Sequence, residues 1–367
     1  MRLATALRHL LPTLLLVGLT LAMSGASLWR SGEAVLLDAW FRLRGPVPAT
    51  GEVVLVLIDD ESIRRLGGWP LTRQNLARLV EHLDEAGAQV IAFDLLLTEP
   101  GRVERDHGFT PDDDSGEAVG QVIDRYLLQD DRDGRLITAM AAHGNVLLPF
   151  AFVFDPAQAN RAGLPATYWR HAYSVVRIPG GWIGHLPLPV GVLGPADPLV
   201  DAAHALGHVT AIVDADGHLR TDYTTIGFDG LYYPSLAVEI ARLQLGLARE
   251  AVAVDLSGRL TLGDRPVPVD PELRLWPNFR GDLSALEVIP AHAILDPEGG
   301  VDPAAADWAD RVDGRAVLVG AHALGLGDTY RTPFAEQLPG VAMVAMAADS
   351  IIAGNALLRP AWQEEAN

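Results

Sequence analysis

Residues 51–100 read GEVVLVLIDDESIRRLGGWPLTRQNLARLVEHLDEAGAQVIAFDLLLTEP, and the architecture of the chain can be predicted from their pattern. The run 52–60 is apolar and β-branched between Gly51 and acidic residues, which predicts a buried strand. Residues 72–86 carry apolar side chains at helical spacing, with Thr72 as N-cap and Gly87 as C-cap. Residues 89–97 predict a second buried strand, so the segment forms a right-handed βαβ unit with two parallel strands.

The remainder of the chain repeats these element types. Further buried strands are predicted at 146–154 and 315–321, and helices at 236–247 and 340–353. The runs 208–214 and 218–225 flank an Asp-Gly turn and predict an antiparallel hairpin. The fold class is therefore α/β, with a mixed, largely parallel sheet, flanking helices and one antiparallel hairpin. Residues 99–135 are rich in acids, Gly and Pro and predict a solvated loop or insertion with one helical stretch near 117–128.

A transmembrane helix is predicted before this domain. Residues 10–29 carry no ionisable side chain, and 20 residues at about 1.5 Å each can cross the hydrocarbon core as a helix. Arg2 and Arg8 precede the run, which places the N-terminus in the cytoplasm and the following residues outside. A cleaved signal peptide is the alternative, because Ser24-Gly25-Ala26 is a small-x-small triplet. The apolar stretch at 34–41 continues the helix and favours an uncleaved anchor.

These boundaries divide the chain into a cytoplasmic tip and anchor (1–29), a juxtamembrane helix (30–48), an extracytoplasmic domain (49–360) and a tail (361–367). We expect the tail to lead towards a second membrane segment.

Charge excludes one class of partner. Residues 51–367 hold 23 arginines against 45 acidic residues, a net charge of −22, and the chain has neither lysine nor cysteine. Nucleic-acid affinity requires cations that neutralise phosphates, so we expect no nucleic-acid partner. The absence of cysteine removes disulfides and thiolate chemistry.

Acidic residues follow the buried strands. Ligands of parallel sheets bind at the carboxyl ends of the strands, so these acids and nearby arginines are candidate ligand-binding residues. The candidates are Asp59, Asp60, Arg73, Asp94, Arg280, Asp328 and Arg331. The alternative is a structural network in which the acids pair with Arg73, Arg280 or Arg331. No catalytic residue, metal ligand or cofactor is predicted.

The ordered motifs resemble one family. The double Asp at 59–60, the Gly-x-Trp-Pro turn, the Phe-Asp strand, the segment GRAVLVGAHALGLGDTYRTPF (314–334) and the LPGVAMVAMAADSIIAGNALLRP ending (338–360) are similar to the type-two CHASE domain. The resemblance covers residues 30–360. It implies an extracytoplasmic sensory domain of a bacterial receptor, located in the inner membrane with its sensor in the periplasm.

The resemblance also implies partners. In that family an adenylate cyclase, diguanylate cyclase or kinase follows the sensor, and such effectors act as dimers, so we expect a homodimer that responds to an unknown ligand or periplasmic protein. The chain itself is then not an enzyme. The alternative function is an exported metal-assisted hydrolase that uses Asp59, Asp94 and Asp328.

Overall fold

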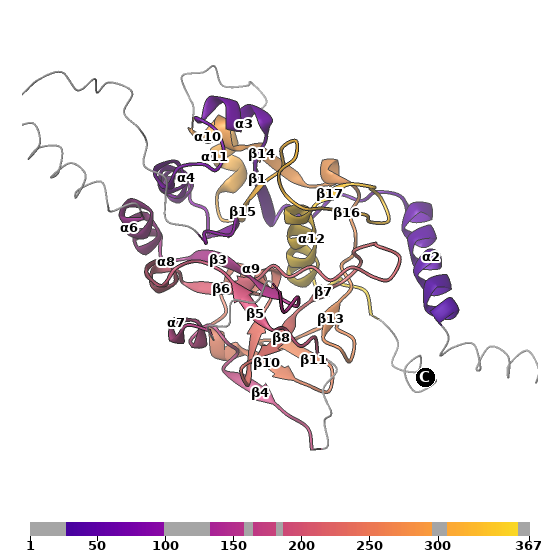
Figure 1. The fold of residues 1–367 in the computed structure, drawn as a ribbon. Helices are drawn as coiled ribbons and strands as arrows, with labels where there is room; N and C mark the ends of the chain where they lie inside the picture. Colours follow the sequence, from indigo (N-terminus) through magenta and orange to yellow (C-terminus); the bar gives the residue numbers. More distant parts are fainter. Residues whose placement is uncertain (1–26, 99–132, 158–163, 181–185, 296–306, 359–367) are drawn as a thin grey trace, which may run out of the picture.

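A computed structural model describes residues 27–98, 133–157, 164–180, 186–295 and 307–358. At its centre lies a seven-stranded sheet (Figure 1) with the order β14-β1-β15-β2-β3-β5, in which β6 also pairs with β3. Neighbouring strands run parallel, except that β5 is antiparallel to β3. The strands are β1 (Val53–Ile58), β2 (Val90–Asp94), β3 (Val146–Val153), β5 (Gly191–Leu193), β6 (Ala205–His208), β14 (Glu287–Pro290) and β15 (Ala316–Ala321). The predicted mixed α/β class is confirmed.

The two strands of the predicted βαβ unit are parallel but are not neighbours. β15 lies between β1 and β2, and its residues 316–321 pair with both strands. A strand from the C-terminal part of the chain thus completes the centre of the sheet.

Alternate side chains of β1 supply two separate cores. Val54, Val56 and Ile58 face one side of the sheet, and Val53, Leu55 and Leu57 face the other, as the two-residue period of a strand requires. The first side is covered by α3 (Asp60–Arg65), α4 (Arg73–Glu85), α6 (Gly134–His143), α7 (Ala166–Trp169), α8 (Asp197–Ala202), α10 (Ala291–Leu295) and α11 (Trp308–Val312). The second side is covered by α9 (Leu236–Gln244) and α12 (Gly340–Ile352).

Local signals fix the ends of these helices. The Thr72 hydroxyl accepts the N–H of Asn75 at the start of α4, as predicted, and Ser235 does the same for Val238 at the start of α9. Gly87 follows α4 with a φ of 82°, which fits the predicted helix end. At Gly320 a β-carbon would lie 2.5 Å from Val341, so glycine permits the close approach of β15 to α12.

Small sheets surround the central one. The largest of them has the order β12-β11-β10-β4, and three two-stranded pairs are β13-β7, β16-β17 and β8-β9. Their strands are β4 (Val175–Arg177), β7 (Asp222–Tyr223), β8 (Thr225–Phe228), β9 (Leu231–Pro234), β10 (Val252–Asp255), β11 (Arg259–Leu262), β12 (Arg265–Val267), β13 (Arg274–Leu275), β16 (Thr329–Tyr330) and β17 (Leu338–Pro339).

The prediction of a hairpin at 208–225 is wrong, because its two arms pair with other strands. The turn at Asp214–Gly217 forms, but β6 before it pairs with β3 and β7 after it pairs with β13. An antiparallel hairpin occurs one step later, between β8 and β9, at Asp229-Gly230. Both turn residues have positive φ, 50° and 76°, which is the geometry of a tight two-residue hairpin.

Helix α2 (Ser27–Arg44) lies at the edge of the molecule beside β16 and β17 (Figure 1). Phe41 anchors it, with ring contacts to Phe279 and Phe334 at 5.4 and 6.0 Å. No helix in the described ranges is long and apolar enough to span a bilayer. Residues 10–26 of the predicted anchor lie outside the described residues, as do residues 99–132 of the acidic loop and the tail 361–367.

Candidate functional site

A cavity of about 510 Å³ lies at the carboxyl ends of β2 and β15. Six segments build its wall: the turn into α4 with its first residues, the end of β2, Ala151 of β3, the residues after β6, the stretch leading into β7, and the loop from β15 into α12. Apolar side chains form most of the lining, among them Trp69, Leu76, Leu95, Leu96, Leu97, Val209, Leu219, Val341, Met343 and Val344. Both the size and the apolar lining are typical of small-molecule sites.

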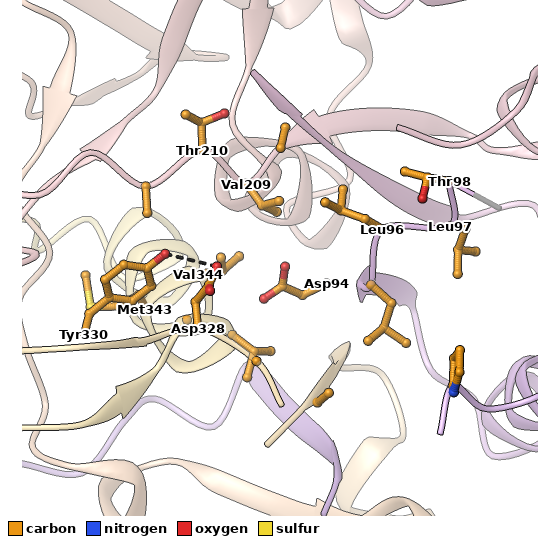
Figure 2. A pocket seen from close by; sticks show the side chains of 18 of the residues that line it. Asp94, Leu96, Leu97, Thr98, Val209, Thr210, Asp328, Tyr330, Met343 and Val344 are labelled. Atoms are coloured by element: carbon orange, nitrogen blue, oxygen red, sulfur yellow. Dashed lines mark hydrogen bonds between the residues drawn. The ribbon is translucent and has the colours of Figure 1, made fainter. Parts of the chain in front are cut away.

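Asp94 is the last residue of β2 and points into this cavity (Figure 2). Its strand neighbours are fully buried, so the backbone fixes its side chain at the strand end. Within the described part of the chain no hydrogen-bond donor or arginine contacts the carboxylate. Burial, and then the charge of Asp328, raise the pKa of Asp94 to about 7. Asp94 is therefore a partly buried carboxyl group that faces the cavity and has no partner among the described residues.

Asp328 faces Asp94 across the cavity (Figure 2). It follows β15 through a glycine-rich loop, and the hydroxyl of Tyr330 donates a hydrogen bond to it at 3.4 Å. Burial and the charge of Asp328 raise the pKa of Tyr330, so the phenol stays protonated and remains a donor. Two carboxylates and one hydroxyl thus share this end of the cavity.

A third acid, Asp222 of β7, also lines the cavity, and it was not predicted. Its carboxylate accepts the hydroxyl of Ser235 at 2.7 Å. Burial raises the pKa of Asp222 to about 6 although the Ser235 hydrogen bond opposes the shift. The available signal was an acid inside a β-branched run, TDYTT at 221–225, where an ionised side chain is costly without a function or a partner.

Arg73, a predicted candidate, does line the cavity. It is the first residue of α4 and is 8% exposed. Its guanidinium donates to Asp133 at 2.7 Å, which ties α4 to the start of α6. The structure therefore brings Arg73, Asp94 and Asp328 together out of the predicted set.

Asp59 and Asp60 lie at the end of β1 and do not line the cavity. The carboxylate of Asp59 accepts the N–H of Ser62 at 2.7 Å and caps α3. Asp60 accepts the N–H of Leu324 at 3.1 Å and so holds the loop after β15. Both contacts satisfy backbone donors, which is the structural alternative for strand-end acids.

Arg280 and Arg331 also lie away from the cavity. Arg280 is 6% exposed and pairs with Asp349 of α12 at 2.6 Å. Asp349 accepts in addition the backbone N–H of Thr50 at 2.9 Å. Arg331 is exposed and pairs with Glu336 at 2.8 Å. Arg280 is thus a buried clamp between α12 and the residues that precede β1, and Arg331 is a surface pair.

These placements bear on the hydrolase alternative. It requires Asp59, Asp94 and Asp328 around one metal, yet only two of the three face the cavity. Among the described residues, no three His, Asp or Glu side chains lie close enough together to hold a metal ion. The arrangement supports binding of a molecule spread over the cavity better than metal-assisted chemistry at one point.

A short segment joins the cavity to α2. Leu219, Thr221 and Asp222 line the cavity, while Arg220 between them faces the opposite way. Arg220 is 1% exposed and contacts both carboxylate oxygens of Asp38 in α2, at 2.9 and 2.8 Å.

Two acids of the preceding turn, Asp214 and Asp216, contact the same guanidinium at 2.8 Å. Burial opposes the charge of Arg220, but the hydrogen bonds of the three acids raise its pKa, so it stays charged. Sequence analysis missed this cluster because nothing in the spacing of 38 and 220 indicates that they meet.

A family model described as the CHASE2 domain matches residues 13–367, nearly the whole chain. No curated protein and no solved structure matches.

Proposed function

The chain belongs to the CHASE2 domain family, a family of extracellular sensory domains, and from this premise we propose that it is the signal-input domain of a bacterial transmembrane receptor. The stimulus is a small molecule that binds in the cavity at the ends of β2 and β15. The effector that it controls is an adenylate cyclase, a diguanylate cyclase or a kinase on the cytoplasmic side of the inner membrane. The sensor itself lies in the periplasm and catalyses no reaction.

The segment Leu219–Asp222 carries this proposal. It presents three side chains to the cavity and one, Arg220, to Asp38 of α2. A ligand that moves Thr221 or Asp222 must also move Arg220, since they are consecutive residues. Because the Arg220–Asp38 pair is buried and bidentate, the helix follows that movement more easily than the pair breaks. Ligand binding at the cavity is therefore coupled to α2, the helix that follows the predicted anchor 10–29.

Helix α2 offers a surface for a second copy of the chain. Leu36, Trp40 and Leu43 are 63%, 71% and 85% exposed and lie four and three residues apart, on one helix face. Leu37, Asp38 and Phe41 occupy the opposite face and contact the body. The apolar stretch 34–41 is thus divided between the body and solvent. We assign the exposed face to a parallel homodimer, because apolar side chains at this spacing pair in helical dimers.

Cross-linking in membranes tests the coupling without knowledge of the ligand. Trp40→Cys would be the only thiol of the chain, so its disulfide rate reports the distance between two copies of α2. Ala211→Trp places an indole into the cavity that Ala211 lines, and Val213→Trp adds the same bulk to the same loop outside it. We expect Ala211→Trp to change the cross-linking rate at least about twofold and Val213→Trp to leave it unchanged.

A second variant tests whether the coupling passes through the Arg220–Asp38 contact. Asp38→Asn weakens the contact to α2 but leaves Arg220 paired with Asp214 and Asp216, so the guanidinium is not left uncompensated. In this background the Ala211→Trp effect should disappear. Equal cross-linking rates in the Trp40→Cys parent and in its Ala211→Trp variant would show that the cavity does not communicate with α2, and the proposal would fall.

A further inference from the structure

We propose that the cavity binds a small organic cation, an amine whose ammonium group lies between Asp94 and Asp328 and whose hydrocarbon part rests on the apolar wall. This inference rests on the proposed function, because it takes the same cavity as the sensory site, and it adds the chemical class of the ligand.

The charge around the cavity is the first argument. Three carboxylates line it, Asp94, Asp328 and Asp222, and they come from three separate segments of the chain. Arg73 is the one cation among the described lining residues, and its guanidinium is already bound to Asp133 at 2.7 Å. The cavity therefore holds an excess of negative charge that attracts cations and repels anionic ligands.

The state of Asp94 is the second argument. A carboxylate that is shielded from solvent normally has a partner, because burial of an isolated charge is costly. Asp94 has none in the described structure, and burial together with Asp328 raises its pKa to about 7. An ammonium group between the two acids would offset the repulsion from Asp328 and would stabilise the ionised form of Asp94 that burial disfavours. The geometry fits, because both acids line the cavity and Figure 2 shows the side chain of Asp94 pointing towards Asp328.

The apolar wall distinguishes an organic amine from an inorganic cation. Leucines 95, 96 and 97, Val209 and Val344 surround the acids, and a hydrated metal ion would gain nothing from them. The described part of the chain also places no three acids or histidines in metal-binding proximity. A cavity of about 510 Å³ accommodates a molecule of roughly ten to twenty heavy atoms with one charged end.

Calorimetric titration of the full-length chain in detergent tests the inference. The probes are 2-phenylethylamine, its neutral isostere 2-phenylethanol, 1,5-diaminopentane, and magnesium as an inorganic cation. We expect the amines to bind and the alcohol and magnesium not to bind. Asp94→Asn should weaken amine binding about 10- to 100-fold, the effect of losing a charge-assisted hydrogen bond.

Two readouts exclude a general charge effect. Asp264→Asn removes an acid from the exposed turn between β11 and β12 and should leave amine affinity unchanged. Amine binding should also release protons between pH 6 and 7, because it favours the ionised form of Asp94. Asp328, Asp222, Tyr330 and Arg73 are the other ionisable groups on the cavity wall, and the release should disappear in Asp94→Asn.

The inference is overturned if no amine binds, if 2-phenylethanol binds as tightly as its amine, or if Asp94→Asn retains full affinity. Its failure is distinct from failure of the proposed function. Cross-linking that responds to Ala211→Trp while no amine binds would leave a signalling cavity for another ligand class. Amine binding with an unresponsive helix would leave a binding site that does not signal.

Discussion

Asp94 places an ionisable group in a strand whose other side chains are apolar and buried. The cost of that arrangement depends on pH. The unfolded chain releases the Asp94 proton near its ordinary pKa of 3.8, whereas the folded chain keeps it until about pH 7. Between these values unfolding releases a proton, so a rise in pH favours the unfolded state. The contribution of Asp94 to stability is therefore fully present below pH 4 and is lost as pH rises to 7.

Asp94→Asn should remove this dependence. We expect the variant and the natural chain to have similar melting temperatures at pH 4, and the variant to be more stable at pH 8 by on the order of 1–3 kcal/mol, or a few degrees. Thermal unfolding from pH 4 to 8 measures the difference, with Asp264→Asn as the control that should show none. A variant that melts lower than the natural chain at every pH would mean that Asp94 is a structural partner after all.

Some of the individual residues of the site were predicted from the sequence. Asp94, Asp328 and Arg73 could be found because strand ends of a parallel sheet meet at one edge. Asp59 and Asp60 met the same criterion but cap backbone donors, and sequence alone does not separate the two uses of a strand-end acid. Asp222 lies in a segment whose pairing was predicted wrongly.

Among the elements, helix α2 shows how tertiary contacts decide which of its apolar residues are buried. Its sequence predicted an apolar helix but did not tell which apolar residues face the body. Phe41 is 4% exposed and Trp40 is 71% exposed, although the two are neighbours of similar character. The difference arises from Phe279 and Phe334, which come from distant parts of the chain.

A cysteine scan along α2 tests the exposed face. Cysteines at Leu36, Trp40 and Leu43 should form disulfides between copies in membranes, because all three lie on the exposed face. Cysteines at Leu37 and Phe41 should not, since those side chains pack against the body. Non-reducing gels of membranes treated with a mild oxidant give the result. Equal cross-linking at all five positions, or none at any, would contradict the assigned dimer face.

The predicted strands and helices of the core formed, because buried apolar runs and capping residues are local signals. The hairpin at 208–225 did not form as predicted. The Asp-Gly turn was predicted correctly, but the strand before it pairs with β3 and the strand after it pairs with β13. Each strand can pair with any free strand edge in the molecule. The local sequence pattern therefore does not determine which strand becomes its partner.

For the molecule as a whole, Arg280 holds both ends of the described domain together. It pairs with Asp349 of α12, and its carbonyl accepts a hydrogen bond from the N–H of Val47, which directly follows Pro46 and lies three residues beyond the end of α2 at Arg44. The chain thus enters and leaves the domain at one place. This fits the expectation that the tail leads back towards a second membrane segment beside the predicted anchor.

Fusions to the last described residue, Leu358, test that topology. An alkaline-phosphatase fusion should be active in bacteria, and a β-galactosidase fusion should be inactive, because the domain is expected outside the cytoplasm. Deletion of residues 10–29 should abolish the phosphatase activity. The reverse pattern of activities would place the domain in the cytoplasm and end the sensor proposal.

The position of β15 has a consequence for biosynthesis. A ribosome makes β1 and β2 early, but the strand that separates them, residues 316–321, is made long after both. Until then the two early strands have unpaired edges and the chain must be kept from aggregating. A message that terminates early yields a protein without the middle of its sheet, which proteases can remove. Only molecules translated past residue 321 can complete this sheet, and so only these reach the receptor population.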